Sequence, residues 1–179
     1  MKTFEEVYPT IPGNGWLTEG EARLLWDSAL VTEGYILEVG CHNGRSTCLL
    51  AALGRPVICV DPWAGVLGDE GDEAAYLSFR QNLTERGHLT SVFINRCRVE
   101  DWAKNKPPKV GFAYLDGDHT YDGTVAQVEK AIACRADAIT LHDCNDTGGG
   151  AEVKRAALEL LGPWQHRVER LAVWTRNNT

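Results

Sequence analysis

Apolar runs of strand length alternate with segments of helical periodicity along most of this chain. The runs that predict strands begin at Ile36 and then occupy Val57–Val60, Val92–Ile94, Val110–Leu115 and Ala138–Leu141. Near the C-terminal end, two further strand-like runs lie close enough together to pair as an antiparallel hairpin. They are Gln165–Val168 and Leu171–Thr175.

The segments between these runs carry apolar residues at helical spacing. Thr18–Glu21 is a capping-box pattern that opens a helix. Its apolar face consists of Ala22, Leu25, Trp26, Ala29 and Leu30. Further helices are predicted over Ser46–Leu53, around Ala75, Phe79 and Leu83, around a buried stripe of Val125, Val128 and Ile132, and over Ala151–Leu161.

Strands that alternate with helices indicate a mainly parallel sheet covered on both faces. The order of elements predicts a Rossmann-like, doubly wound α/β fold with seven strands, the last two forming the antiparallel hairpin. A length of 179 residues favours one domain spanning 1–179. Residues 1–15 are rich in proline and glycine, and we expect them to form an irregular arm.

Charge and hydropathy exclude several classes of partner. The formal net charge is −7 and no basic run occurs, so a nucleic-acid partner is not expected. No apolar run approaches membrane length, and the first residues turn acidic at once, unlike a signal peptide. The six cysteines are scattered without any C-x-x-C pair, which favours free thiols in a reducing cytoplasm over a zinc site.

The most informative motif joins the first predicted strand to the helix after it. It reads Glu38-x-Gly40-x-x-x-Gly44, where small residues let the backbone approach a ligand closely. Asp61 ends the next strand about 20 residues later, which is the place of an acid that binds ribose hydroxyls in nucleotide-binding α/β units. The G-x-G-x-x-G pattern of dinucleotide enzymes is missing, so no pyrophosphate site is predicted.

A second group of polar residues follows the fourth and fifth predicted strands. Asp116, Asp118 and His119 follow one strand, and His142 with Asp143 follow its neighbour. Ligands bind at the carboxyl ends of strands in such sheets, so these side chains are expected to meet. Asp116 and Asp143 offer oxygen ligands for a hard cation such as magnesium.

The third metal ligand and the roles of the two histidines stay open at this point. Either His142 or Asn145 is a candidate, and a histidine ligand would extend the choice of metal toward manganese, iron or zinc. Asp118 is expected to cap the following helix rather than to bind an ion, and the same capping role is the alternative for Asp116. Structural roles as hydrogen-bonded histidines are the alternative for His119 and His142.

These two motifs resemble known methyltransferases. Glu38-x-Gly40-x-x-x-Gly44 resembles the first motif of class I S-adenosylmethionine-dependent methyltransferases. The segment from Asp116 to Tyr121, followed by Leu141-His142-Asp143, resembles the small methyltransferase family numbered 24 and the metal-dependent sugar O-methyltransferases of macrolide biosynthesis. The resemblance implies methylation of a small-molecule hydroxyl, with His119 as the base. It also implies a metal held by Asp116 and Asp143. The chain departs from the macrolide enzymes at His142, where they have a carboxylate, and the position of His142 beside Asp143 makes it the expected third ligand.

The same resemblance implies a set of residues around S-adenosylmethionine. They are Glu38, Gly40, Cys41, Asn43, Gly44, Ser46, Asp61, Trp63, Arg98 and Asp116. For Trp63, a place in the core or in a lid is as well supported as contact with the cofactor. For the segment 98–101, a solvated loop is as well supported as contact with adenine. The acidic loop Gly65–Asp72 is a candidate lid over the acceptor. Since 179 residues leave little room for a cap, a homo-oligomer could complete the pocket.

Three other functions compete with methyl transfer. One is a nicotinamide oxidoreductase, which the glycine spacing disfavours. The second is a non-catalytic domain that binds S-adenosylmethionine or a nucleotide. The third is a metal-dependent hydroxylase, because a relative of this family in cephalosporin biosynthesis is linked to hydroxylation.

Overall fold

The computed structural model describes residues 2–64, 73–104 and 108–176. The helices are α1 (Phe4–Val7), α2 (Glu19–Leu30), α3 (Arg45–Ala51), α4 (Glu73–Glu85), α5 (Tyr121–Ala133) and α6 (Gly149–Leu161), with short 3-10 turns η1 (Tyr8–Thr10) and η2 (Leu89–Ser91). The strands are β1 (Ile36–Val39), β2 (Val57–Val60), β3 (Val92–Asn95), β4 (Phe112–Leu115), β5 (Ala138–Leu141), β6 (His166–Val168) and β7 (Leu171–Thr175).

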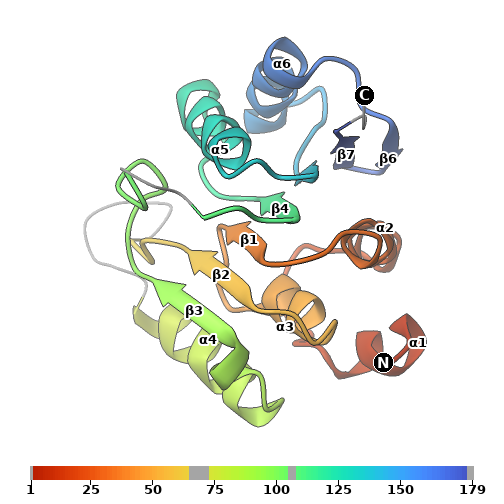
Figure 1. The fold of residues 1–179 in the computed structure, drawn as a ribbon, viewed down its shortest axis with the longest axis vertical. Helices are drawn as coiled ribbons and strands as arrows, with labels where there is room; N and C mark the ends of the chain where they lie inside the picture. The colour runs from red at the N-terminus through yellow and green to blue at the C-terminus, as the bar shows by residue number, and fades with distance from the viewer. Residues whose placement is uncertain (1, 65–72, 105–107, 177–179) are drawn as a thin grey trace.

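The strands form one seven-stranded sheet in the order β3-β2-β1-β4-β5-β7-β6 (Figure 1). Strands β1 to β5 pair in parallel, and β7 runs antiparallel to both β5 and β6. The predicted doubly wound fold with its C-terminal hairpin is therefore confirmed. The order reverses between β1 and β4, and this switch point is where doubly wound sheets bind ligands.

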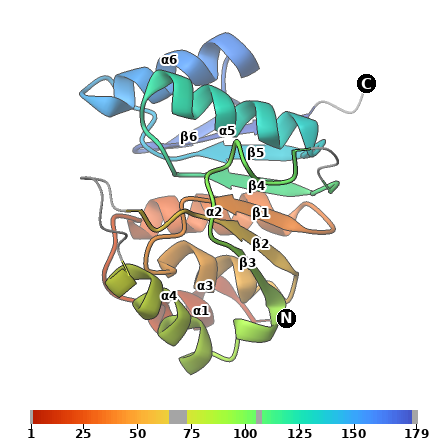
Figure 2. The same cartoon turned by 90° about the vertical axis from the view of Figure 1, so that its left-hand side faces the viewer.

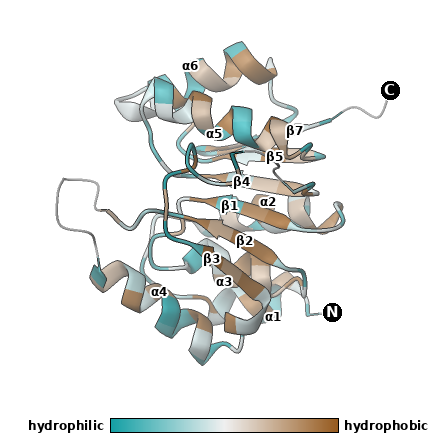
Figure 3. Cartoon of the chain, turned by 60° about the vertical axis from the view of Figure 1, so that its left-hand side comes forward, coloured by the Kyte–Doolittle hydropathy of each residue, from teal (hydrophilic) through white to brown (hydrophobic). Residues whose placement is uncertain are grey.

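Helices cover both faces of the sheet (Figure 2). Alternate strand residues supply two separate cores, because successive side chains of a strand point to opposite faces. One core joins the sheet to α1, α2, α3 and α4, and the other joins it to α5 and α6. The central strands are mostly hydrophobic, with the acidic Glu38 inside β1, whereas the helices mix polar and apolar surfaces (Figure 3). The polar residues of the site are consequently displayed at the strand ends.

The N-terminal segment is more regular than predicted. Thr3 and Glu6 form a capping box that opens α1, and Phe4 and Val7 are buried against the rest of the protein. The prediction of an irregular arm is thus wrong for residues 4–10. A helix of four residues is too short for periodicity to reveal it, and the prolines and glycines that follow dominate the composition.

Two predicted helical faces also need correction. In α5 the buried residues are Gly123, Thr124, Gln127, Val128 and Ala131, whereas Ile132 is largely exposed and Val125 is half-buried. In α2 the capping box of Thr18 and Glu21 is confirmed, but Leu30 is exposed at the helix end. Both errors arise because an apolar side chain is not always a buried one. In α5, polar Thr124 and Gln127 take buried positions because they bind the turn that follows β4.

Free thiols account for all six cysteines, and every one except Cys97 is buried. The prediction of unpaired cysteines is confirmed. Within the described parts of the chain, no helix is both long and apolar enough to cross a membrane. The acidic loop proposed as a lid, Gly65–Asp72, lies outside the described residues.

Candidate active site

A cavity of about 910 Å³ opens at the carboxyl ends of β1, β2, β4 and β5. Most residues expected from the sequence line it together. They are Gly40, Cys41, Asn43, Ser46, Asp61, Trp63, Arg98, Asp116, His119, His142 and Asp143. Glu38 and Gly44 are not among its lining residues. The volume lies within the usual range for small-molecule and cofactor sites.

Gly40 allows the ends of β1 and β4 to approach each other. Its φ is +84°, and a Cβ there would lie 2.2 Å from the carbonyl oxygen of Asp116. The Gly40 N–H donates to Val60 on the other side. Any larger residue would push the two central strands apart at the point where the cavity begins.

Asp61 organises the turn that follows β1. Its Oδ2 accepts hydrogen bonds from the backbone N–H groups of Cys41, at 2.7 Å, and His42, at 2.9 Å. Its Oδ1 accepts from the N–H of Trp63 at 2.6 Å. Each carboxylate oxygen has about two lone-pair sites, so Oδ2 is fully used and Oδ1 retains one site for a ligand.

Glu38 lies beneath the same turn and has no exposed surface. The Ser46 hydroxyl donates to Oε1, and the Cys59 thiol lies 3.7 Å from Oε2. Burial raises the pKa of Glu38 to about 7, despite the hydrogen bond from Ser46. Glu38 thus ties β1 to α3 from within the protein, and it supports the cavity without lining it.

Trp63 combines the two roles that the sequence left open. Its ring packs in the core against Tyr76 and Phe79, with centroid distances of 5.0 and 4.9 Å. Its Nε1 donates to the carbonyl of His42 at 2.7 Å, and part of the residue lines the cavity. Arg98, after β3, lines the cavity at the same end.

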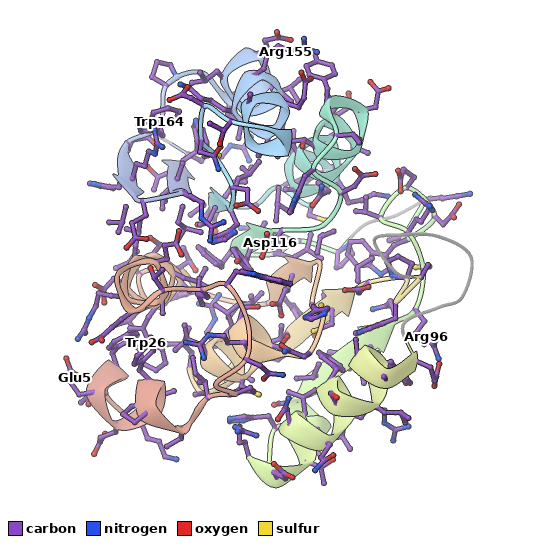
Figure 4. The ribbon with its side chains drawn as sticks, turned by 180° about the vertical axis from the view of Figure 1, so that it is seen from behind. Glu5, Trp26, Arg96, Asp116, Arg155 and Trp164 are labelled. Atoms are coloured by element: carbon purple, nitrogen blue, oxygen red, sulfur yellow. The ribbon has the colours of Figure 1, made fainter. Side chains whose placement is uncertain are left out.

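The acidic and histidine residues from β4 and β5 meet at the other end of the cavity. Figure 4 labels Asp116 in the middle of the molecule, between β1 and β4. His142 Nδ1 lies 3.3 Å from Asp116 Oδ1 and 3.5 Å from Asp143 Oδ2. His119 Nε2 lies 3.5 Å from Asp116 Oδ1, and its Nδ1 lies 3.5 Å from Asp143 Oδ2. Two imidazoles therefore share the same two carboxylates.

Two residues that sequence reasoning missed complete this cluster. Arg170, in the β6–β7 turn, donates from its guanidinium to Asp143 Oδ1 at 2.8 Å. Glu21, in the first turn of α2, has its Oε2 3.3 Å from His142 Nε2. Glu21 stands in a capping box and Arg170 in a hairpin turn, and neither pattern points to a site. The fold brings these positions together although they lie 149 residues apart, and Glu21 accepts from the Arg170 N–H.

The charges of this cluster shift one another's pKa values. Burial alone would lower the pKa of His142, but the nearby carboxylates of Asp116, Asp143 and Glu21 raise it to about 11. Burial opposes ionisation of Asp116 and Glu21, yet their histidine partners hold the pKa of Asp116 well below its usual range and that of Glu21 at about 2. The hydrogen bond with Asp116 likewise raises the pKa of His119.

The donor set fits a divalent cation. Asp116, His142 and Asp143 each offer one ligand atom, and these atoms all lie within 4.8 Å of one another. Three carboxylates (Asp116, Asp143 and Glu21) meet one guanidinium, so two negative charges remain when both imidazoles are neutral. Asp143 has a φ of +55°, a strained conformation for a non-glycine residue that is common at functional sites.

Two neighbouring polar residues have local roles. Asn145 Oδ1 accepts hydrogen bonds from the N–H and hydroxyl of Thr147. Of the two candidates for a third ligand, His142 lines the cavity and Asn145 is not among its lining residues. Asp118 Oδ1 accepts from the N–H of Thr120, the residue that caps α5. The prediction that Asp118 caps the helix is therefore wrong, because Thr120 is the cap and Asp118 orders the turn before it.

The turn after β4 is held by residues that the sequence did not single out. Gln127 of α5 accepts from the Gly117 N–H at 2.9 Å and donates to the Asp118 carbonyl at 2.8 Å. The Tyr114 hydroxyl donates to Asp116 Oδ2 at 3.0 Å. These bonds leave Asp116 Oδ1 facing the two histidines.

The sequence around this site matches a known protein family. Residues 37–144 match a family model described as a methyltransferase domain. A comparison with curated proteins gave no match.

Solved structures share the fold at low sequence identity. One is the apo TDP-rhamnose 3'-O-methyltransferase of calicheamicin biosynthesis, with 20% identity, a TM-score of 0.65 and coverage of 90% of this chain and 82% of that chain. An O-methyltransferase from Bacillus cereus in complex with SAH has 16% identity, a TM-score of 0.67 and coverage of 96% and 90%. A structure described as a putative rRNA methylase from Clostridium thermocellum has 17% identity, a TM-score of 0.66 and coverage of 88% and 97%.

Proposed function

The chain belongs to the methyltransferase-domain family, and from that premise we propose that it is an S-adenosylmethionine-dependent O-methyltransferase. In this proposal it methylates a hydroxyl group of a small molecule with the help of a divalent cation. One observation carries the proposal. A single cavity connects the glycine turn and Asp61 at one end with the Asp116–His119–His142–Asp143 cluster at the other.

The glycine-turn end suits the methyl donor. Gly40, Cys41 and Asn43 of the turn after β1 line the cavity, and Asp61 Oδ1 retains acceptor capacity for a ribose hydroxyl. Arg98 and Trp63 line the same end and would flank the adenosine. The solved O-methyltransferase from Bacillus cereus, whose fold this chain shares, is described as a complex with SAH.

The opposite end suits activation of a hydroxyl. Methyl transfer forms a bond between the acceptor oxygen and the methyl carbon while the bond from that carbon to sulfur breaks, and the hydroxyl proton must go to a base. His119 lines the cavity with a side chain 43% exposed, so its imidazole is open to an acceptor. The contact with Asp116 raises the pKa of His119, which strengthens this imidazole as an acceptor for a hydroxyl proton.

Asp116, His142 and Asp143 would hold the cation in this proposal. When bound, a divalent cation would lower the pKa of an acceptor hydroxyl. Arg170 holds Asp143 by a 2.8 Å hydrogen bond, which fixes the carboxylate beside His142. Tyr114 does the same for Asp116 from the core side.

The residues that precede α2 favour an acceptor that contains a ring. Gly15, Trp16 and Leu17 line the cavity near the cluster, and the Arg170 guanidinium donates to the carbonyl of Trp16. Trp16 is 73% exposed and its ring lies 5.8 Å from that of His42. An exposed indole at the mouth of a cavity suits contact with a ring compound, such as a phenol or a sugar.

A turnover assay tests the proposed function. The purified protein is incubated with S-adenosylmethionine and a panel of catechols, phenols and sugars, and release of S-adenosylhomocysteine is measured with magnesium, manganese, cobalt or EDTA. We expect release that needs both a hydroxylated acceptor and a divalent cation. A matched reaction without acceptor corrects for slow hydrolysis of the donor.

The other outcomes contradict defined parts of the proposal. Turnover that EDTA leaves unchanged would remove the metal from the mechanism. Donor binding without turnover across the panel would favour a non-catalytic binding domain. Oxygenated rather than methylated product would favour the hydroxylase.

A further inference from the structure

Glu21 is a buried carboxylate placed directly behind the proposed metal site. Its side chain has no exposed surface, although glutamate is rarely buried without a partner. Oε2 accepts from the Thr18 N–H at 3.0 Å, and Oε1 accepts from the Arg170 N–H at 3.1 Å. These bonds hold the carboxylate rigidly at the start of α2, with Oε2 turned toward His142.

His142 lies between this carboxylate and the cavity. The residue is 3% exposed, and its Nε2 has no aligned hydrogen-bond partner among the described residues, although Glu21 Oε2 lies 3.3 Å away. Its other nitrogen, Nδ1, faces Asp116 and Asp143. The two ring nitrogens therefore face two different environments, one a single buried carboxylate and the other the cluster that lines the cavity.

We propose that Glu21 is a positioning residue that retains the proton on Nε2 of His142, so that a bound metal displaces the proton of Nδ1 into solvent and takes the lone pair of that nitrogen. The inference rests on the proposed function, because it concerns the same site. A metal-binding histidine usually donates its second N–H to a carboxylate or carbonyl, and this contact sets its tautomer and orientation. Glu21 Oε2 lies 3.3 Å from Nε2, whereas the ion pairs with Asp116 and Asp143 are formed by Nδ1.

The consequence is a preference among metals. An imidazole nitrogen with two carboxylates suits borderline transition ions such as manganese, iron, cobalt or zinc better than magnesium, which prefers oxygen ligands. By fixing Nδ1 toward the cavity, Glu21 makes His142 a nitrogen ligand rather than a residue that only packs beside the metal. The site is thus expected to bind cobalt more tightly than magnesium.

The substitution Glu21→Gln separates this role from helix capping. Glutamine retains the shape and an oxygen for the Thr18 N–H, and it is accepted at this position of a capping box. It removes the negative charge that faces Nε2. Glu19→Gln is the matched control, because Glu19 lies two residues earlier in the same helix and is exposed.

The experiment measures cobalt and magnesium affinities of the metal-free protein by competition with a chromophoric chelator, together with the visible spectrum of bound cobalt. We expect Glu21→Gln to weaken cobalt binding by about 10- to 100-fold and to change the cobalt spectrum, while Glu19→Gln matches the wild type. In a His142→Asp background, Glu21→Gln should no longer weaken binding, and the preference should move toward magnesium. Circular dichroism confirms that each variant is folded.

Two results would overturn the inference. Equal cobalt affinity in wild type, Glu21→Gln and Glu19→Gln would show that Glu21 only caps α2. An equal loss from Glu21→Gln in the wild-type background and in the His142→Asp background would show that it acts without His142. Neither result touches the proposed methyl transfer, whereas a wild-type protein that binds no metal would contradict both this inference and the metal-assisted part of the function.

Discussion

At the scale of single residues, the proposed site depends on a few side chains that share charges. Asp116 and Asp143 each face both His119 and His142, so none of the four ionises independently. The acids and histidines could be chosen from the sequence because they follow strands directly. Glu21 and Arg170 could not, because they come from a helix start and a hairpin turn that only the tertiary fold brings to the site.

His119 is the residue whose replacement tests the base directly. We expect His119→Ala to lower kcat about 10²- to 10⁴-fold, because the hydroxyl would lose its proton acceptor, while the affinity for S-adenosylhomocysteine stays near that of wild type. Steady-state kinetics with a verified acceptor and calorimetry give the two quantities. His166→Ala, on the exposed strand β6, is the control. Near-full turnover by His119→Ala would rule out His119 as the base.

At the scale of elements, the turn from β1 to α3 carries the strongest sequence signal and the clearest geometry. Strands Val57–Val60 and Ala138–Leu141 were predicted to the residue, since each is a short apolar run with turn residues beside it. The buried face of α5 was not, because Thr124 and Gln127 are buried to satisfy the backbone after β4. Polar residues with such local partners escape a hydrophobic pattern.

Gly40 tests how tightly that turn must approach β4. Gly40→Ala is expected to destabilise the fold by at least about 2 kcal/mol, because it adds a clash to an unfavourable positive φ. Gly54→Ala is the matched control, with a φ of +74° and open space around a Cβ. Urea unfolding measures both. If the two variants lost equal stability, the close approach to Asp116 would not be the reason for glycine.

Glu38 makes stability depend on pH through the same turn. Its folded pKa of about 7 exceeds the ordinary 4.5, so the folded state keeps a proton that the unfolded state releases. Its contribution is fully favourable below about pH 4.5 and is lost as pH rises to about 7. We therefore expect Glu38→Gln to gain stability relative to wild type between about pH 5 and about pH 8, by at most about 3 kcal/mol.

Thermal unfolding at these two pH values measures the gain. Glu33→Gln, at an exposed position before β1, controls for loss of a negative charge. A difference between Glu38→Gln and wild type that did not change with pH would mean that Glu38 titrates normally in the folded protein.

At the scale of the whole molecule, the fold explains why both halves of the proposed chemistry lie in one cavity. The sheet reverses its order between β1 and β4, so the turn after β1 and the acids after β4 flank the same opening. The alternation of elements was sufficient to predict this arrangement. The acceptor could not be predicted, because the walls near Trp16 and Arg170 come from segments without a recognisable motif.

Calorimetric titration of S-adenosylhomocysteine and of a divalent cation into the same protein tests the central claim most directly. The account predicts micromolar binding of S-adenosylhomocysteine and a separate metal heat. Asp143→Asn should abolish the metal heat and leave the cofactor heat, while Asp122→Asn, at an exposed position in the first turn of α5, should change neither. Absence of S-adenosylhomocysteine binding with magnesium, manganese, cobalt and EDTA alike would contradict the account.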